Sequence, residues 1–176
     1  MRTLQLPPAQ LLHERSRSLE EALARESRTE IQQICNDMAT IVARGFNVAA
    51  PPVSVLGVRP HRVSEGVCVY EKFGDYDLDS SHIRLWMRTA MLQKVTSFGT
   101  LLSTLCHELC HHLDVVQLNF PNTFHTRGFY ERAALLYHHA RNTPVRPLVW
   151  VEQEDGTFRV NWAQTMSSSH SPARRK

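Results

Sequence analysis

The chain has 176 residues, of which 42% are hydrophobic, and its formal net charge at pH 7 is +3. This length fits one domain with its own core and is too short for us to expect two. No stretch approaches the ~20 apolar residues of a membrane span, and the first residues lack the apolar core of a signal peptide. We therefore expect a cytoplasmic protein with no membrane partner. The mild positive charge permits contact with nucleic acid but does not argue for it.

The first third of the chain predicts two amphipathic helices. Leu12, Leu19 and Leu23 recur at helical spacing. Residues 27–30, Ser-Arg-Thr-Glu, have the pattern of a capping box that opens a second helix, and that helix ends near Gly45. Both helices are assigned to packing on a sheet and are given no chemistry.

Three strands are predicted next, at residues 53–58, 67–73 and 81–88. In the third strand, apolar and polar residues alternate, which places one face on the core and the other in solvent. The acidic run at 75–79 between the last two strands is similar to a calcium loop. It lacks the glycine and the final glutamate of an EF-hand, so we predict a solvated turn.

The next segment predicts two helices joined by a loop. Ser97 can cap a long helix that runs to about Gln117, and Pro121-Asn122 marks the loop. The second helix begins at residue 125 or 127 and ends at 141. Apolar residues define a buried face on the first of these helices: Phe98, Leu102, Leu105, Cys106, Leu109, Leu113 and Val116.

The C-terminal part predicts a β-hairpin, with strands near 148–151 and 157–162 on either side of Asp155-Gly156. A polar tail at 167–176 is predicted to be disordered, which leaves one domain at 1–166. The fold class is therefore α+β, with N-terminal helices, a small and mainly antiparallel sheet, and further helices.

The cysteines indicate no metal or disulfide site, whereas the histidines cluster in one region of the chain. The four cysteines match neither a disulfide framework nor paired zinc-binding CxxC motifs, so we interpret them as reduced and mostly buried thiols: Cys35, Cys68, Cys106 and Cys110. Of ten histidines, six lie between His107 and His139, which points to a site in this region.

The segment His107-Glu108-Leu109-Cys110-His111 is an HExxH motif inside the predicted long helix. Residues four apart lie about 40° from one another around a helix, so both imidazoles can reach one metal ion. Glu108 lies about 100° from His107, where it can act as general base toward water rather than as a ligand. Zinc is the expected metal for this ligand pair.

A catalytic zinc site needs a third protein ligand. His125 follows His111 by fourteen residues, beyond a turn that can return the chain over the site. Glu131 follows by twenty residues, a spacing similar to that of thermolysin-type zincins. The two residues lie about 120° apart on one regular helix and cannot both bind from it.

The HExxH motif, followed by Phe124-His125-Thr126-Arg127-Gly128-Phe129, resembles the SprT-like and related small zincins. Those proteins place a third histidine at the start of the next helix, with an aromatic residue four positions later. The resemblance implies a zincin-like fold and hydrolysis of peptide bonds in a protein substrate. It also implies that His125, in preference to Glu131, completes a zinc site with His107 and His111.

The residues around the motif allow weaker predictions. Asp114 is either an outer-shell partner of a ligand imidazole or an exposed carboxylate. A solvated or outer-shell role suits His112, and Cys110 is interpreted as a packed thiol. For three residues we prefer packing or exposure to a role in stabilising an oxyanion: Tyr130, Arg132 and Tyr137. His138 and His139 are predicted on the helix surface.

Two classes of function follow. The first is a zinc metallopeptidase in which strand 81–88 edges the cleft and pairs with an extended peptide. The alternative is a metal-stabilised binding or regulatory module with little turnover.

Association with nucleic acid is a further possibility, which rests only on the mild basicity and on Arg174-Arg175-Lys176. The sequence gives no indication of oligomeric state.

Overall fold

The computed structural model describes residue 6, residues 8–120 and residues 125–167. The loop predicted at Pro121-Asn122 and residues 168–176 of the predicted tail lie outside these residues, and Ser167, predicted as the first residue of the tail, ends the last helix. The architecture is α+β, as expected. The helices are α1 (Ala9–Ala24), α2 (Arg28–Gly45), α3 (Phe98–Val116), α4 (Arg127–Arg141) and α5 (Trp162–Ser167). The strands are β1 (Val53–Val58), β2 (His61–Ser64), β3 (Val67–Glu71), β4 (Gly74–Tyr76), β5 (Ile83–Arg88), β6 (Trp150–Glu152) and β7 (Phe158–Val160).

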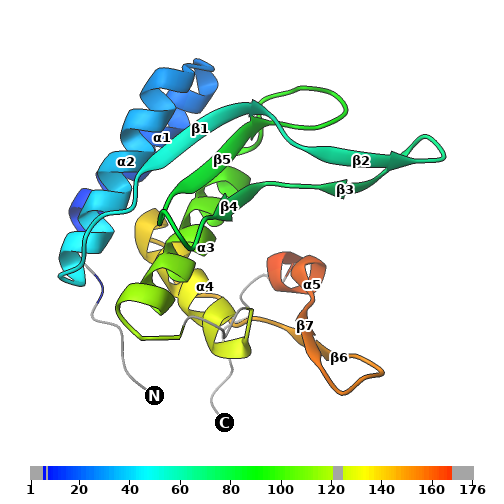
Figure 1. Ribbon diagram of the computed structural model, residues 1–176. Helices are drawn as coiled ribbons and strands as arrows, with labels where there is room; N and C mark the ends of the chain where they lie inside the picture. The colour runs from blue at the N-terminus through cyan, green and yellow to red at the C-terminus, as the bar shows by residue number, and fades with distance from the viewer. Residues whose placement is uncertain (1–5, 7, 121–124, 168–176) are drawn as a thin grey trace, which may run out of the picture.

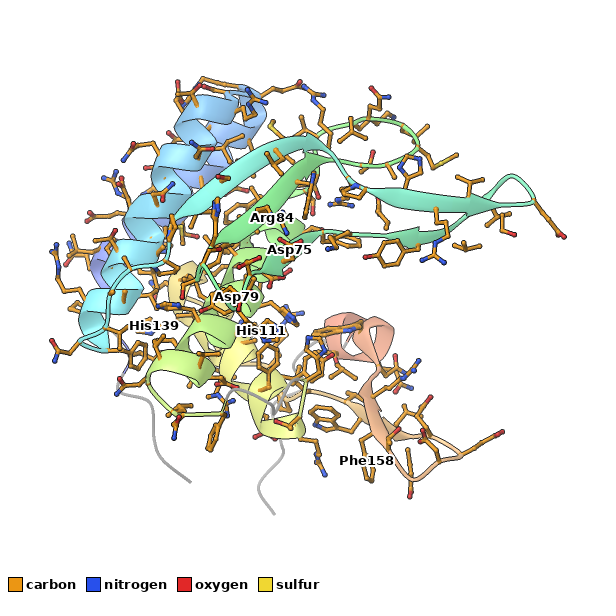
Figure 2. The ribbon with its side chains drawn as sticks, in the orientation of Figure 1. Asp75, Asp79, Arg84, His111, His139 and Phe158 are labelled. Atoms are coloured by element: carbon orange, nitrogen blue, oxygen red, sulfur yellow. The ribbon has the colours of Figure 1, made fainter. Side chains whose placement is uncertain are left out.

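The central sheet has the order β1-β5-β4, with β1 parallel and β4 antiparallel to β5. Strand β5 is therefore the middle strand, and the expectation that residues 81–88 would edge a cleft is wrong. The outer strand on this side is β4, part of which we had assigned to a solvated turn. Asp75 fits into a strand because Lys72 and Arg84 neutralise it across distances of 2.8 and 2.7 Å. Asp75 and Arg84 lie side by side on neighbouring strands (Figure 2).

Strands β2 and β3 pair in an antiparallel hairpin that projects from the body of the molecule (Figure 1). Its side chains are mostly exposed, which explains why hydrophobic patterning did not predict β2. Arg59 at the base of the hairpin is buried, donates hydrogen bonds to Glu71 and Thr96, and lies over the ring of Phe73. These contacts join the hairpin to the rest of the fold.

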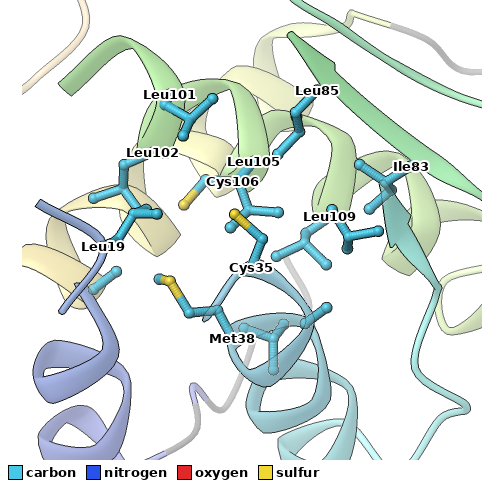
Figure 3. Packing of buried hydrophobic residues seen from close by; sticks show 14 of the residues in the cluster. Leu19, Cys35, Met38, Ile83, Leu85, Leu101, Leu102, Leu105, Cys106 and Leu109 are labelled. Atoms are coloured by element: carbon cyan, nitrogen blue, oxygen red, sulfur yellow. The ribbon is translucent and has the colours of Figure 1, made fainter. Parts of the chain in front are cut away.

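Helices α2 and α3 pack on the sheet, and α4 packs on α1 and α3. Helix α1, which we had expected to pack on the sheet, packs mainly on α2 and α4 instead, and residues of all four helices share one hydrophobic core with β1 and β5. Figure 3 shows part of this core, with labelled residues from α1, α2, α3 and β5. The predicted buried face of α3 is confirmed except at its two ends, where Phe98 is only partly buried and Val116 is 43% exposed. Among the described residues, no helix is both long enough and apolar enough to cross a bilayer.

The predicted cap of α2 is only partly right. Ser27 is the N-cap residue, but its side chain makes no capping hydrogen bond. Glu30 pairs with Arg25 instead of closing a capping box. The C-terminal hairpin is confirmed as β6 and β7, with Gly156 in the left-handed conformation that its turn requires. The short helix α5 follows this hairpin and was not predicted.

Candidate metal centre

The HExxH motif lies in the middle of α3. The start of this helix is fixed by Ser97, whose hydroxyl accepts a hydrogen bond from the backbone N–H of Thr100, as predicted. One helical turn then separates His107 from His111, and their Nε2 atoms lie 3.2 Å apart. His111 is labelled in Figure 2, where α3 meets α4. The predicted convergence of these two imidazoles is thus present in the fold.

The third imidazole comes from His125, which directly precedes α4. Its Nε2 atom lies 3.0 Å from that of His107 and 3.2 Å from that of His111. His125 has a φ of 56°, and the next residue, Thr126, caps α4 by accepting a hydrogen bond from the N–H of Phe129. This backbone turn at the start of α4 brings the ring back over α3. Glu131, the other predicted third ligand, is exposed on α4 and does not belong to the cluster.

The three imidazoles have the spacing and protonation state that a metal ion requires. Two ligands of a tetrahedral zinc ion at about 2.05 Å lie about 3.3 Å apart, close to the separations in this cluster. Burial, assisted by the neighbouring imidazoles, lowers the pKa of His107 to about 3 and that of His111 to about 4. Burial also lowers the pKa of His125. All three rings are therefore neutral at pH 7, as ligands must be.

Phe129 forms the floor of the cluster. Its side chain has no exposed surface, and its ring centroid lies 4.7 Å from that of His107, 4.4 Å from that of His111 and 5.3 Å from that of His125. Tyr130 stacks on His125 at 5.8 Å. Packing by these two aromatic rings restricts the imidazole rotamers, which prearranges the ligands.

Glu108 lies beside the cluster in a largely buried position, with 6% of its surface exposed. Burial raises the pKa of its carboxyl group to about 8; the charge of Asp75 adds to this effect and that of Lys72 opposes it. Gly74 of β4 packs directly on this carboxyl group. The proximity of Gly74 was not apparent from the sequence, because strand pairing brings it to α3 from 34 positions away.

Both His107 and Glu108 line a cavity of about 910 Å³. One wall is the chain from Tyr70 to Gly74, and other walls come from α3, α4 and the segment that includes Trp162. We call this cavity the groove. Its volume is in the range of small-molecule and peptide sites, and it brings a candidate base and one candidate ligand into the same space.

The remaining predicted residues have identifiable partners. Asp114 is buried, not exposed, and its carboxylate accepts hydrogen bonds from Arg132 of α4 at 2.6 and 2.5 Å. A link between Asp114 and a ligand imidazole stays a prediction. Cys110 is a buried free thiol, as predicted.

Of the two roles predicted for His112, the solvated one is wrong, and the outer-shell one stays a prediction. Its side chain is buried, with Nδ1 at 3.1 Å from the hydroxyl of Tyr76 and Nε2 at 2.9 Å from the carbonyl oxygen of Ala49. Tyr76 also stacks on His111. These contacts fix α3 to the sheet next to the candidate ligands.

Comparison of the chain with protein-family models, with curated proteins and with solved structures gave no match.

Proposed function

We propose that this chain is a zinc-dependent metallopeptidase of the small HExxH zincin kind. One observation carries the proposal: three imidazole Nε2 atoms lie within 3.2 Å of one another, next to a buried carboxyl group that opens into the groove. Three neutral histidines with an open side are the ligand set of catalytic rather than structural zinc.

The positions of the residues assign a role to each in the proposed reaction. His107, His111 and His125 would hold zinc, which when bound lowers the pKa of a coordinated water and polarises a carbonyl group. The Glu108 carboxylate accepts the proton of the attacking water and delivers it to the nitrogen of the leaving amine. Burial raises the pKa of this carboxyl group to about 8, which makes its ionised form a stronger base than an exposed carboxylate. The positive charge of bound zinc would favour that ionised form.

The outer edge of β4 can hold an extended peptide. Backbone groups alternate in direction along a strand. The carbonyl oxygen of Phe73 accepts a hydrogen bond from the N–H of Trp86 in β5, and the N–H of Asp77 donates one to the carbonyl oxygen of His82, directly before β5. The N–H and C=O groups of Gly74 and Tyr76 therefore point away from β5. A substrate that adds as a further strand at this edge passes beside Glu108.

The test compares zinc content and peptide hydrolysis in single variants. Glu108→Gln should keep one zinc per chain and reduce hydrolysis of casein by about 10²- to 10⁴-fold. His111→Ala should lose the zinc as well as the activity. Metal content is measured by plasma mass spectrometry and hydrolysis by release of labelled fragments.

Glu131→Gln is the matched control, because it removes an exposed carboxylate on α4 and should leave both quantities unchanged. Hydrolysis by Glu108→Gln at the wild-type rate would refute the role of Glu108. Stoichiometric zinc without chelator-sensitive hydrolysis by the wild-type chain would favour the binding-module alternative.

A further inference from the structure

The groove continues well beyond the candidate metal centre. Helices α3 and α4 pack together in opposite directions, so that His107 lies near Tyr130, and Gly99 near Tyr137. Ser103, Thr104, Ala133, Ala134 and Tyr137 line the groove between these two points. It therefore runs from the imidazoles toward the start of α3 and the end of α4.

Two arginines and a histidine gather at this far end. Arg141, Arg146 and His138 all line the groove. The guanidinium of Arg141 donates a hydrogen bond to the hydroxyl of Tyr137 at 2.8 Å and lies 5.3 Å from the ring centroid of Phe98. The two arginines also lower the pKa of His138, although burial is the larger cause. We call this group the basic end of the groove.

The carboxylates of the described residues that line the groove do not pair with Arg141 of the basic end. Among the lining residues the structure describes, the carboxylates are those of Glu71 and Glu108. Glu71 is already engaged by the buried Arg59 and by the backbone N–H of Ala90. Glu108 lies at the opposite end, beside the imidazoles. The ion pairs of the described residues include no carboxylate partner for Arg141.

We propose that the groove selects peptides with an acidic side chain, which the basic end binds. This inference rests on the proposed function, because it takes a peptide substrate as the molecule that occupies the groove. Aromatic and small apolar side chains along the groove would contact the intervening residues, and the arginines would bind the carboxylate.

The length of the groove sets the position of the acidic residue. His107 and Gly99 are eight residues apart on α3, which corresponds to about 12 Å along the helix axis. An extended peptide advances about 3.3 Å per residue. The acidic side chain therefore lies about four residues from the bond beside Glu108.

The decisive measurement is peptide binding by the full-length, zinc-supplemented Glu108→Gln chain. The probes are two fluorescein-labelled decapeptides of alanine and serine, one with two adjacent glutamates and the other with two glutamines. Fluorescence anisotropy should show about five-fold tighter binding of the glutamate peptide, and the preference should shrink at high salt. Adding Arg141→Gln and Arg146→Gln should abolish it.

Two further variants separate charge from structure. Arg141→Lys keeps the charge and should retain most of the preference, whereas Arg44→Gln removes an exposed arginine of α2 and should retain all of it. Equal binding of both peptides, or a preference that survives the double arginine substitution, would overturn the proposal. Tighter binding of a single-stranded DNA 10-mer, lost in the same double variant, would also overturn it.

Hydrolysis by the wild-type chain is measured separately on the same peptides. Absence of cleavage with the binding preference intact would count against the peptidase function alone. Cleavage without the preference would count against the role of the basic end alone.

Discussion

Gly74 of β4 lies directly against Glu108 of α3: a methyl group on Gly74 would sit 3.1 Å from Oε1 of Glu108 and 2.6 Å from Cγ2 of Thr104. The strand can approach the helix this closely only because residue 74 has no side chain. The same contact keeps the carboxyl group of Glu108 largely out of water while leaving it in the wall of the groove.

Gly74→Ala should therefore disturb both packing and chemistry. Because the new Cβ overlaps Cγ2 of Thr104, either that side chain or the packing of β4 on α3 must shift, and overpacking of this kind costs roughly 1–3 kcal/mol of unfolding free energy. The new Cβ would also lie 3.1 Å from Oε1 of Glu108 and displace the carboxyl group, so peptide hydrolysis should fall by more than the folded fraction does. Urea denaturation and steady-state hydrolysis measure the two effects.

Gly57→Ala is the matched control for this substitution. Gly57 also lies in a strand of the central sheet, but a Cβ there meets no atom within 4 Å. Its effect on unfolding should stay within about 0.5 kcal/mol. Equal losses in the two variants would show that Gly74 has no special relation to Glu108.

The sequence predicted the elements whose signals are local. The capped helix α3 and the positions of His107 and His111 depend only on helical periodicity, and both agree with the structure. Helical periodicity alone could not decide between His125 and Glu131 as the third ligand, because the position of His125 depends on a left-handed backbone turn at that residue. Only the folded chain shows that this turn brings the imidazole to the other two.

Strand pairing was the main source of error. The resemblance to small zincins led us to expect residues 81–88 at the edge of the cleft, yet β1 and β4 flank β5 on both sides. The polar side chain of Arg84 is tolerated in this central strand because it pairs with Asp75. The environment of His112 was equally inaccessible, since its partner Tyr76 is 36 positions away in the sequence.

Phe129→Ala should weaken the metal site without removing a ligand. The ring is fully buried beneath His107, His111 and His125, so its loss leaves a cavity that costs about 3–5 kcal/mol of unfolding free energy. The imidazoles then gain rotamer freedom, and zinc affinity should fall about ten-fold or more. Competition with a chromogenic chelator measures the affinity.

Phe129→Leu keeps most of the buried volume and should fold more stably than the alanine variant, while still lacking the aromatic floor. Phe158→Ala removes a phenyl ring that is 44% exposed, and zinc affinity should not change. Wild-type zinc affinity in a folded Phe129→Leu protein would show that the aromatic ring does not position the ligands.

Zinc binding should resist mild acid. A protonated imidazole cannot bind a metal, and an imidazole with a lowered pKa stays neutral to lower pH. The pKa is about 3 for His107 and about 4 for His111, and the pKa of His125 is also lowered. Three histidines with the ordinary pKa of about 6.5 would lose about fifty-fold in affinity between pH 7.5 and 6.0, whereas this site should lose less than about four-fold. Chelator competition at the two pH values, corrected for protonation of the chelator, measures the change.

A synthetic peptide of residues 104–116, whose histidines are solvated, is the control and should show a steeper loss of zinc affinity over the same pH range. A fifty-fold loss in the folded chain would mean that burial does not protect these imidazoles from protons.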